Sequence, residues 1–368
     1  MKKTILKGLK KVIPLITLFT LNITLFAQVE NDLTARFNAT VNGDMTMIAN
    51  TVISRTATQD YNDEDGNHDF IDNVYVDIDS DTSTFNSSNA TFVNPEPQIA
   101  CLSIRKAYIY WAAGDKETST GADNQPNWNF NDIKLMLPGE TEYTTVTADE
   151  VIYRGRTTHF DNDPYICFKD ITAAVTQLNS PYGTYQVANI EAKTGALFSH
   201  QSGIPGTAGG WQIVYVYESP EMTTKNISLF DGYAHITEAF NNFDINFDGF
   251  RTVPDGPVNA NILIGVLEGD RDLLGDQLQI INTANTFVDL SAPQRNPDNF
   301  FNSRITLGDS DFLNRIPAST NTLGFDAALF QLDNPNNSII DNNQTSATIR
   351  LTSNQETYGL FLIGLSVN

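Results

Sequence analysis

The stretch Gly210-Trp211-Gln212-Ile213-Val214-Tyr215-Val216-Tyr217-Glu218 decides the fold class of this chain. Ile213, Tyr215 and Tyr217 occupy every second position, and valines stand between them. A pleated strand turns successive side chains to opposite faces, and β-branched and aromatic residues suit its surface. The stretch therefore predicts a β-strand.

The same signals recur along the chain in both directions. Each further candidate is short, rich in Val, Ile, Thr, Tyr or Phe, and bounded by turn-forming residues. These candidate strands are Ile104 to Ala112, Ile133 to Leu137, Thr144 to Tyr153, Thr184 to Ala192, Ile227 to Phe230, Ala260 to Leu267, Gln277 to Asn282, Ser346 to Thr352 and Leu360 to Val367. Ile171 to Leu178 is the one good helical signal, which we interpret as a short crossover. All-β folds of this kind are sandwiches or barrels, and we predict an antiparallel, jelly-roll-like β-sandwich.

A boundary between two parts of the chain is expected near residue 240. The segment from Phe240 to Pro257 is rich in Asn, Asp, Gly and Pro, which favour turns and bury little. We therefore predict two packed sandwich lobes, residues 28–240 and 241–368. One larger sandwich is the alternative.

The first 27 residues predict the compartment. Five lysines precede a mostly apolar run from Val12 to Ala27, and Leu25-Phe26-Ala27 ends in the small residue that signal peptidase needs. The run is short for a membrane span and contains Pro14 and Asn22. We expect a signal peptide over residues 1–27, cleavage after Ala27, and a secreted or cell-surface protein without membrane insertion after cleavage.

The expected mature chain is strongly acidic. The full chain has 22 basic and 44 acidic residues; removing the five leader lysines leaves 17 basic residues and a net charge of −27. Such a surface repels nucleic acid phosphates and anionic lipid, so binding to either is not expected. Divalent cations are its natural counterions.

Cys101 and Cys167 are the two cysteines, and both lie in the exported part. A disulfide between them is compatible with an oxidising compartment. Buried free thiols are the alternative. Their spacing fits neither a redox pair nor a zinc site, so neither interpretation implies catalysis.

The acidic stretch from Asp60 to Asp81 predicts a calcium site. Alternating spacing in Asp63-x-Asp65-x-Asn67-x-Asp69 sends side-chain oxygens to one side of an extended loop, and Gly66 allows a tight turn. Hard oxygen ligands without His or Cys favour Ca²⁺ over zinc or copper. The candidate ligands here are Asp63, Asp65, Asn67, Asp69, Asp72, Asp77, Asp79 and Asp81. A solvated acidic loop is the alternative.

A second candidate calcium loop begins at Asp244. Asp244, Asn246, Asp248 and Asp255 stand at positions 1, 3, 5 and 12 of an EF-hand-type loop, with Asp in place of the usual last Glu. The flanks are not helical, so a plain connecting loop is the stronger interpretation. Calcium remains a hypothesis at this position.

Catalytic patterns are weak in this sequence. The four histidines are scattered, and no metalloprotease or nucleophile-elbow motif is present. Acids near strand ends could form a glycosidase pair, but acids are so abundant that any pair is weak evidence. Trp128 lies in an Asn-rich loop and is the best candidate for stacking on a sugar, whereas Trp111 and Trp211 lie within strands and are expected in the core.

Several segments together resemble a known family. They include Val74-Tyr75-Val76-Asp77-Ile78-Asp79-Ser80-Asp81, Ala107-Tyr108-Ile109-Tyr110-Trp111, Gly210 to Glu218, Leu229-Phe230-Asp231-Gly232, Glu268-Gly269-Asp270-Arg271 and Asn299-Phe300-Phe301-Asn302-Ser303. In this order they resemble a bacterial exported cell-surface domain found at the N-terminus of DUF11-repeat, gliding-motility-associated surface proteins of type IX secretion. The resemblance implies the head of an adhesin or structural cell-envelope protein. The sequence departs from the family's pattern by stopping at Asn368 without repeats or a sorting domain, so we expect a fragment or a different mode of attachment.

We therefore expect a non-catalytic, calcium-stabilised β-sandwich module that contacts an extracellular glycan or a cell-surface protein. A carbohydrate-binding module or a glycoside hydrolase acting on extracellular polysaccharide is the alternative.

Overall fold

The computed structural model describes residues 29–66, 73–115, 129–154, 163–195 and 206–368. Strands make up 52% of the chain and helix 3%, so the predicted all-β class is confirmed. Several antiparallel sheets pack on one another, as expected for a β-sandwich. No helix in the described ranges has the length and apolarity that crossing a bilayer requires.

A sheet of eleven strands forms the centre of the molecule. Its strands are β1 (Val29–Thr51), β5 (Ser103–Gly114), β8 (Glu150–Arg154), β9 (Pro164–Asp170), β11 (Gly209–Glu218), β12 (Thr224–Ile236), β14 (Ala260–Gly269), β17 (Ile305–Leu307), β18 (Ser310–Asp311), β20 (Gly324–Gln331) and β22 (Tyr358–Val367). They are ordered β18-β17-β20-β14-β22-β12-β1-β11-β5-β9-β8. Only β17 and β20 are parallel among the pairs in this sheet.

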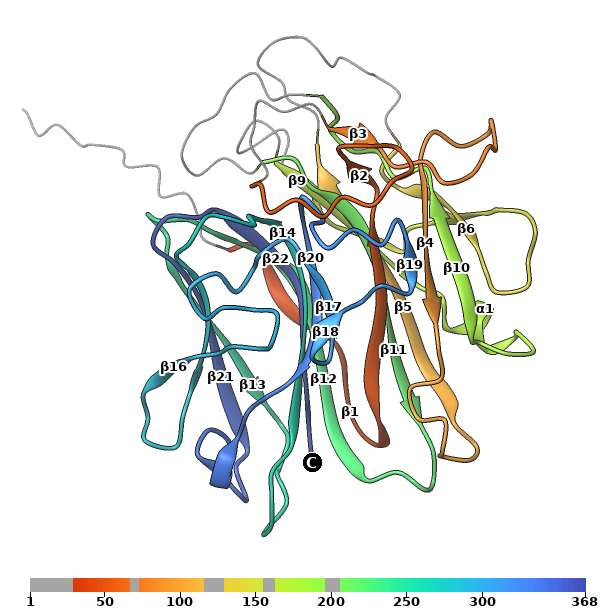
Figure 1. The fold of residues 1–368 in the computed structure, drawn as a ribbon. Coiled ribbons are helices and arrows are strands. Elements are labelled where there is room, and N and C mark those ends of the chain that lie inside the picture. Colours follow the sequence, from red (N-terminus) through yellow and green to blue (C-terminus); the bar gives the residue numbers. More distant parts are fainter. Residues whose placement is uncertain (1–28, 67–72, 116–128, 155–162, 196–205) are drawn as a thin grey trace, which may run out of the picture.

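Strand β1 joins two wings of this sheet. Its residues up to Asn42 pair with β12, and those from Gly43 onward pair with β11. A Cβ at position 43 would lie 1.9 Å from the carbonyl oxygen of Tyr217, so glycine alone allows this close approach. The first wing runs from β18 to β12 with the first part of β1; the second wing comprises the rest of β1 with β11, β5, β9 and β8. The two wings face each other (Figure 1).

Two smaller sheets cover the outer faces of the wings. The five-stranded sheet, in the order β19-β4-β10-β6-β7, packs on the second wing, and the four-stranded sheet, in the order β13-β21-β15-β16, packs on the first. In the part of the chain that the structure describes, the remaining elements are the two-stranded antiparallel sheet of β2 and β3, one short helix and one 3₁₀ turn. The bounds are β2 (Ile53–Ser54), β3 (Val74–Tyr75), β4 (Ser87–Phe92), β6 (Asp132–Met136), β7 (Thr144–Thr147), α1 (Thr172–Thr176), β10 (Gly183–Ala188), β13 (Asn242–Asp248), β15 (Asp276–Ile281), β16 (Phe287–Asp289), β19 (Arg315–Ile316), η1 (Pro335–Asn337) and β21 (Ser346–Ser353).

Neighbouring residues of β11 show how the layers are held together. Trp211 Nε1 donates a hydrogen bond to Ser88 Oγ in the five-stranded sheet, at 2.9 Å. Gln212 points the opposite way, and its Nε2 donates to the carbonyl oxygen of Ile264 in the first wing, at 3.2 Å. Both faces of β11 are therefore buried, so the strand reads as a continuous apolar run. Trp111 and Trp211 are at most 1% exposed, which confirms their expected place in the core.

The hydrophobic interior consists of two clusters on the two sides of the first wing. One fills the space around the second wing and reaches Leu263, Phe325 and Phe361 of the first wing. The other lies between the first wing and the four-stranded sheet, and it includes Ile264 next to Leu263. Adjacent residues of β14 thus enter different clusters, as the twofold alternation of a strand requires.

The turn-rich segment near residue 240 connects β12 to β13. Strands from residues 28–240 occupy one side of the central sheet and strands from 241–368 the other, with β12 and β22 adjacent at the junction. The second half also contributes a strand to the five-stranded sheet of the first half, because β19 pairs with β4. The predicted lobes are therefore joined by continuous sheet pairing.

One predicted strand needs correction. Thr144 to Tyr153 was expected as a single strand, but it forms β7 and β8, which belong to different sheets. The chain turns at Ala148 and Asp149, whose backbone N–H groups donate to Asn131 O and Phe168 O. Thr144 to Thr147 and Val151 to Tyr153 both have strand-forming residues, and their pattern does not show that they belong to different sheets.

Candidate binding groove

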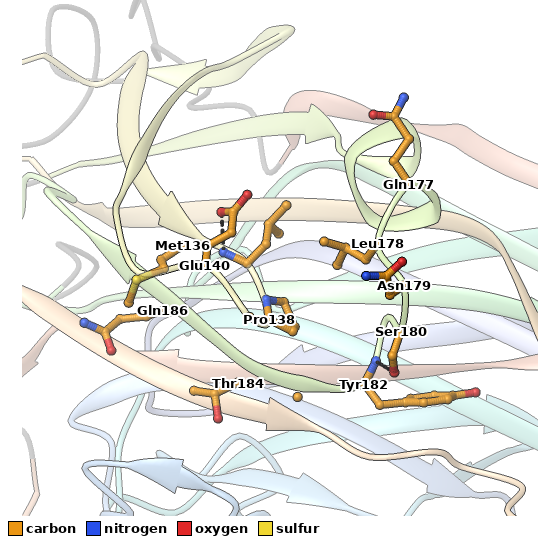
Figure 2. A pocket seen from close by; sticks show the side chains of 13 residues that line it. Met136, Pro138, Glu140, Gln177, Leu178, Asn179, Ser180, Tyr182, Thr184 and Gln186 are labelled. Carbon is orange, nitrogen blue, oxygen red and sulfur yellow. Dashed lines mark hydrogen bonds between the residues drawn. The ribbon is translucent and has the colours of Figure 1, made fainter.

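A groove opens in the five-stranded sheet where β6 and β10 separate. The two strands pair from Ala188 opposite Lys134 to Gln186 opposite Met136, and no further. Beyond Met136 the chain turns away at Pro138, whereas β10 continues along β4 as far as Gly183. The space between them has a volume of about 720 Å³ and is lined by thirteen residues (Figure 2).

Local hydrogen bonds fix both walls of the groove. In the turn after β6, the Leu137 N–H donates to Glu140 Oε2 at 3.0 Å. The opposite wall is the connection from α1 to β10, where the Tyr182 N–H donates to Ser180 Oγ at 3.2 Å. The buried Tyr185 supports this wall from beneath, because its hydroxyl donates to the carbonyl oxygen of Pro181 at 2.7 Å.

Gly183 lets the two walls of the groove approach each other. Its φ of +139° is in the region that favours glycine, and a Cβ there would lie 2.9 Å from the Cβ of Pro138. Beside it, the ring of Tyr182 packs at 5.3 Å from the ring of Phe92. The half-buried tyrosine is thus held at the edge of the groove, as Figure 2 shows.

Gln186 belongs to a polar cluster with Asp79 and Tyr143. The Tyr143 hydroxyl donates to Asp79 Oδ2 at 2.5 Å, and Gln186 Nε2 donates to Asp79 Oδ2 at 2.7 Å and to Tyr143 Oη at 2.6 Å. Burial, followed by the hydrogen bond to Asp79, raises the pKa of Tyr143, so it stays a donor. Since both amide hydrogens of Gln186 are engaged, this residue can offer a ligand only its oxygen.

The lining of the groove is polar but almost uncharged. Among the thirteen lining residues that the structure describes, Glu140 is the only ionisable acid and no Lys, Arg or His occurs. Exposed amides and hydroxyls come from Gln177, Asn179, Ser180 and Thr184. The volume is within the roughly 300–1,000 Å³ range of ligand sites. This lining suits a neutral ligand rich in hydrogen-bonding groups.

The acids predicted as calcium ligands between residues 77 and 81 all accept hydrogen bonds, Asp77 and Asp81 from nearby residues and Asp79 also from distant ones. Asp77 Oδ1 accepts from Ser87 Oγ at 2.9 Å, Asp79 accepts from Tyr143 and Gln186, and Asp81 Oδ1 accepts from the Ser83 N–H at 2.8 Å. Asp79 therefore turns out to support the groove. The donors to its Oδ2, Tyr143 and Gln186, are both neutral.

Asp63 and Asp65 lie in a segment that runs beside residues 318–321. The Asn321 amide donates to the carbonyl oxygens of Asp63 and Asp65, at 3.0 and 2.8 Å, while their own side chains are exposed. Asn67, Asp69 and Asp72 fall outside the described residues, as do Trp128 and the predicted signal peptide, residues 1–27. Among the residues that are described, no group of three or more His, Cys, Asp or Glu is arranged to hold a metal ion.

The predicted EF-hand-type loop is mostly a strand. Asp244, Asn246 and Asp248 point outward from β13, spaced along it by its pleat. Asp244 pairs with Arg350 at 2.6 Å, and Asn246 Oδ1 accepts from Thr348 Oγ1 at 2.8 Å. Asp255 lies beyond the strand, next to the turn at Gly256. An extended strand cannot wrap these oxygens around one ion, so a loop of that type does not form here.

Both cysteines are free in this structure, as in the free-thiol alternative, although only Cys167 is buried. Cys167 is buried on β9 opposite Trp111 of β5, and its sulfur donates to Phe130 O at 3.2 Å. Cys101 is exposed and precedes Ser103, the other end of β5. Eight residues of strand, roughly 26 Å, separate those ends, whereas a disulfide needs Cα atoms within about 7 Å.

Sequence reasoning missed the groove residues. The one available signal was Pro181-Tyr182-Gly183, a turn between the helical segment and the next strand. A scan against models of protein families finds no match for this chain, and a search of curated proteins finds none either.

Proposed function

We propose that this chain is an exported, non-catalytic β-sandwich module that binds an extracellular glycan in the groove between β6 and β10. The observation that carries the proposal is the composition of the groove: amides and hydroxyls on a fixed scaffold, one aromatic edge and a single carboxyl group. Sugars present many hydroxyls and no charge, and they bind to such donors and acceptors together with aromatic surfaces.

Three features support binding over hydrolysis. Glu140 is held by the Leu137 N–H and stands without a second acid among the described lining residues. The groove is open, so a chain can lie along it. Its walls come from a sheet and two short hydrogen-bonded turns, a rigid arrangement that limits the entropy lost on binding.

The proposed compartment is supported by the predicted leader, and the strong negative charge argues against nucleic acid and anionic lipid as partners. A signal peptide over residues 1–27 would deliver the module to the cell surface, where an adhesin or structural envelope protein meets glycans. Stabilisation by Ca²⁺ remains a separate prediction, and Asp63 and Asp65 are among its predicted ligands with exposed side chains. Scanning calorimetry tests it: EDTA should lower the melting temperature, and an unchanged value counts against calcium.

A glycan array with the purified chain tests the proposed function. Wild type should bind a defined set of neutral glycans, and the double substitution Gln177→Ala with Asn179→Ala should reduce that binding at least tenfold. Both side chains are exposed and bury no core surface, so the fold should persist. Gln355→Ala is the control, because it removes an exposed amide that does not line the groove, and it should bind glycan normally. Absence of glycan binding, or release of sugar fragments, would contradict the proposal.

A further inference from the structure

A second pocket lies away from the groove, near the end that Figure 1 marks as the C-terminus. It has a volume of about 740 Å³ and shares no lining residue with the groove. Its lining includes Thr40 on β1, Thr224 and Asn226 on β12, and residues 249–254, which follow β13. We call this space the Arg251 pocket, because Arg251 gives it its charge.

The Arg251 pocket is locally positive in an acidic protein. Arg251 is the only residue with a charged side chain among the eleven described residues that line it. This side chain is exposed and forms no ion pair with any residue that the structure describes. The acids nearest to it in the sequence, Asp248 and Asp255, do not line the pocket. Charges more than about 8 Å away are largely screened at physiological ionic strength, so the rest of the acidic surface does not cancel this positive charge.

Hydrogen bonds hold the arginine and its surroundings in place. Arg251 Nη2 donates to Asn343 Oδ1 at 2.8 Å, and Asn343 Nδ2 donates in turn to the carbonyl oxygen of Pro254 at 3.1 Å. The backbone near the arginine is also fixed, because the Val253 N–H donates to Asn368 O at 3.1 Å. A guanidinium that is positioned before binding loses less conformational freedom when a ligand arrives.

The guanidinium of Arg251 still has two parallel N–H groups to offer. It carries five N–H donors, and Nη2 uses one of its two hydrogens on Asn343. The other Nη2 hydrogen has a parallel neighbour on Nε or on Nη1, and neither of these nitrogens donates to a described residue. Two parallel N–H groups match the two oxygens of a carboxylate. A single guanidinium balances one negative charge, as a carboxylate carries.

Two threonine hydroxyls add hydrogen-bond acceptors to the same pocket. Thr40 Oγ1 donates to Asn226 Oδ1, and Thr224 Oγ1 donates to Asn42 Oδ1, both at 2.8 Å. Each hydroxyl has used its only hydrogen, so its oxygen can accept a hydrogen bond from a ligand. The pocket therefore combines a site for one carboxylate with acceptors for ligand hydroxyl groups.

We propose that the Arg251 pocket binds a hexuronic acid residue of an acidic polysaccharide. Its carboxylate pairs with Arg251, and its ring hydroxyls donate to Thr40 and Thr224. The volume lies within the roughly 300–1,000 Å³ range of ligand sites. This second site goes beyond the binding of a neutral glycan in the groove and does not depend on it, because the two sites share no residue.

Isothermal titration calorimetry with trigalacturonic acid tests the proposal. The buffer contains EDTA, so no divalent cation can bridge the ligand to acidic side chains. Wild type should bind the free acid. The methyl ester of the same trisaccharide keeps its hydroxyls and loses its charge, and it should bind at least about tenfold more weakly, because hydrogen bonds between charged groups are lost.

Variants of Arg251 locate the binding. Arg251→Gln should weaken binding of the free acid at least about tenfold, and Arg251→Lys should fall between it and wild type, because lysine keeps the charge but not the paired N–H groups. Arg251 is exposed, so both variants should fold, which circular dichroism checks. Arg105→Gln is the matched control, since Arg105 pairs with Glu218 outside the pocket, and it should bind like wild type. The groove variant Gln177→Ala with Asn179→Ala should also bind the acid normally.

Four results would overturn the proposal: no binding of trigalacturonic acid, equal affinity for the acid and its methyl ester, full binding by Arg251→Gln, or equally tight binding of a sulfated trisaccharide. The last would show a general anion site. Binding that is lost in the groove variant would overturn it as well, by placing the acid in the groove. A groove that binds no neutral glycan contradicts the proposed function alone, so the two proposals fail separately.

Discussion

Arg36 and Asp231 form a two-point ion pair where the two wings of the central sheet meet. Arg36 Nε lies 2.6 Å from Asp231 Oδ2, and Nη2 lies 3.1 Å from Oδ1. The second wing closes around the pair: the Tyr110 hydroxyl donates to Asp231 at 2.9 Å, and the ring of Phe168 lies 4.0 Å from the guanidinium carbon. The Asp231 side chain is 2% exposed, so its charge depends on Arg36.

Removing Arg36 should therefore destabilise the protein strongly. We expect Arg36→Met to lower the free energy of unfolding by about 3–5 kcal/mol, because it leaves a buried carboxylate without its partner. Lys169→Met is the matched control, since Lys169 pairs with Asp149 at an exposed site, and it should cost less than about 1 kcal/mol. Urea denaturation measures both, and equal losses would contradict the assigned role of Arg36.

A pair of buried acids should make stability depend on pH. Glu356 Oε1 accepts from the Asp270 N–H, and Asp276 Oδ1 accepts from the Phe300 and Phe301 N–H groups, each at 2.7 Å. Burial, reinforced by the neighbouring charge of Asp276, raises the pKa of Glu356 well above its ordinary 4.5. Glu356 is therefore protonated in the folded protein where it would be ionised in the unfolded chain.

The sign of the effect follows from this raised pKa. Protonated Glu356 contributes its full stabilisation of the folded state below pH 4.5. This contribution is lost as the pH rises towards the folded-state pKa, because the unfolded chain releases the proton first. Glu356→Gln keeps an acceptor and a donor but cannot ionise. We expect the variant to gain on wild type above pH 4.5, by at most about 1.4 kcal/mol per pH unit. Denaturation curves from pH 4 to 8 that stay parallel would contradict this assignment.

The two cysteines should react very differently with thiol reagents. Cys101 is exposed, whereas Cys167 is buried, and burial raises the pKa of its thiol, so less of the reactive thiolate is present. We expect one equivalent of iodoacetamide to label the native protein at Cys101, and a second to enter only in denaturant. Protection of both cysteines until a reductant is added would instead show a disulfide.

The strands were predictable wherever the sequence has a continuous run of apolar residues or an alternation of apolar and polar residues. The stretch Gly210 to Glu218 forms most of β11, and Leu360 to Val367 falls within β22. The long first strand was missed because its first part is mostly polar and exposed: Asn31, Thr34 and Asn38 give no apolar pattern, and pairing with β12 holds them in place. The change of partner strand at Gly43 involves a close approach to Tyr217, which is remote in sequence.

The candidate site was not predictable to the same degree. Acidic spacing pointed to Asp79, but its partners Tyr143 and Gln186 are far away in the chain, and only the fold shows that they occupy its oxygen. The groove arises because β6 ends where β10 continues, a difference in strand length that sequence patterns do not encode.

Hydrogen–deuterium exchange with the best glycan from the array tests the central claim most directly. Saturating glycan should slow amide exchange in residues 136–140 and 177–186, which form the two walls of the groove, and leave β13 and β16 unchanged. Protection confined to another surface, or exchange in the two walls that the glycan does not alter, would contradict the assignment of the groove as the binding site.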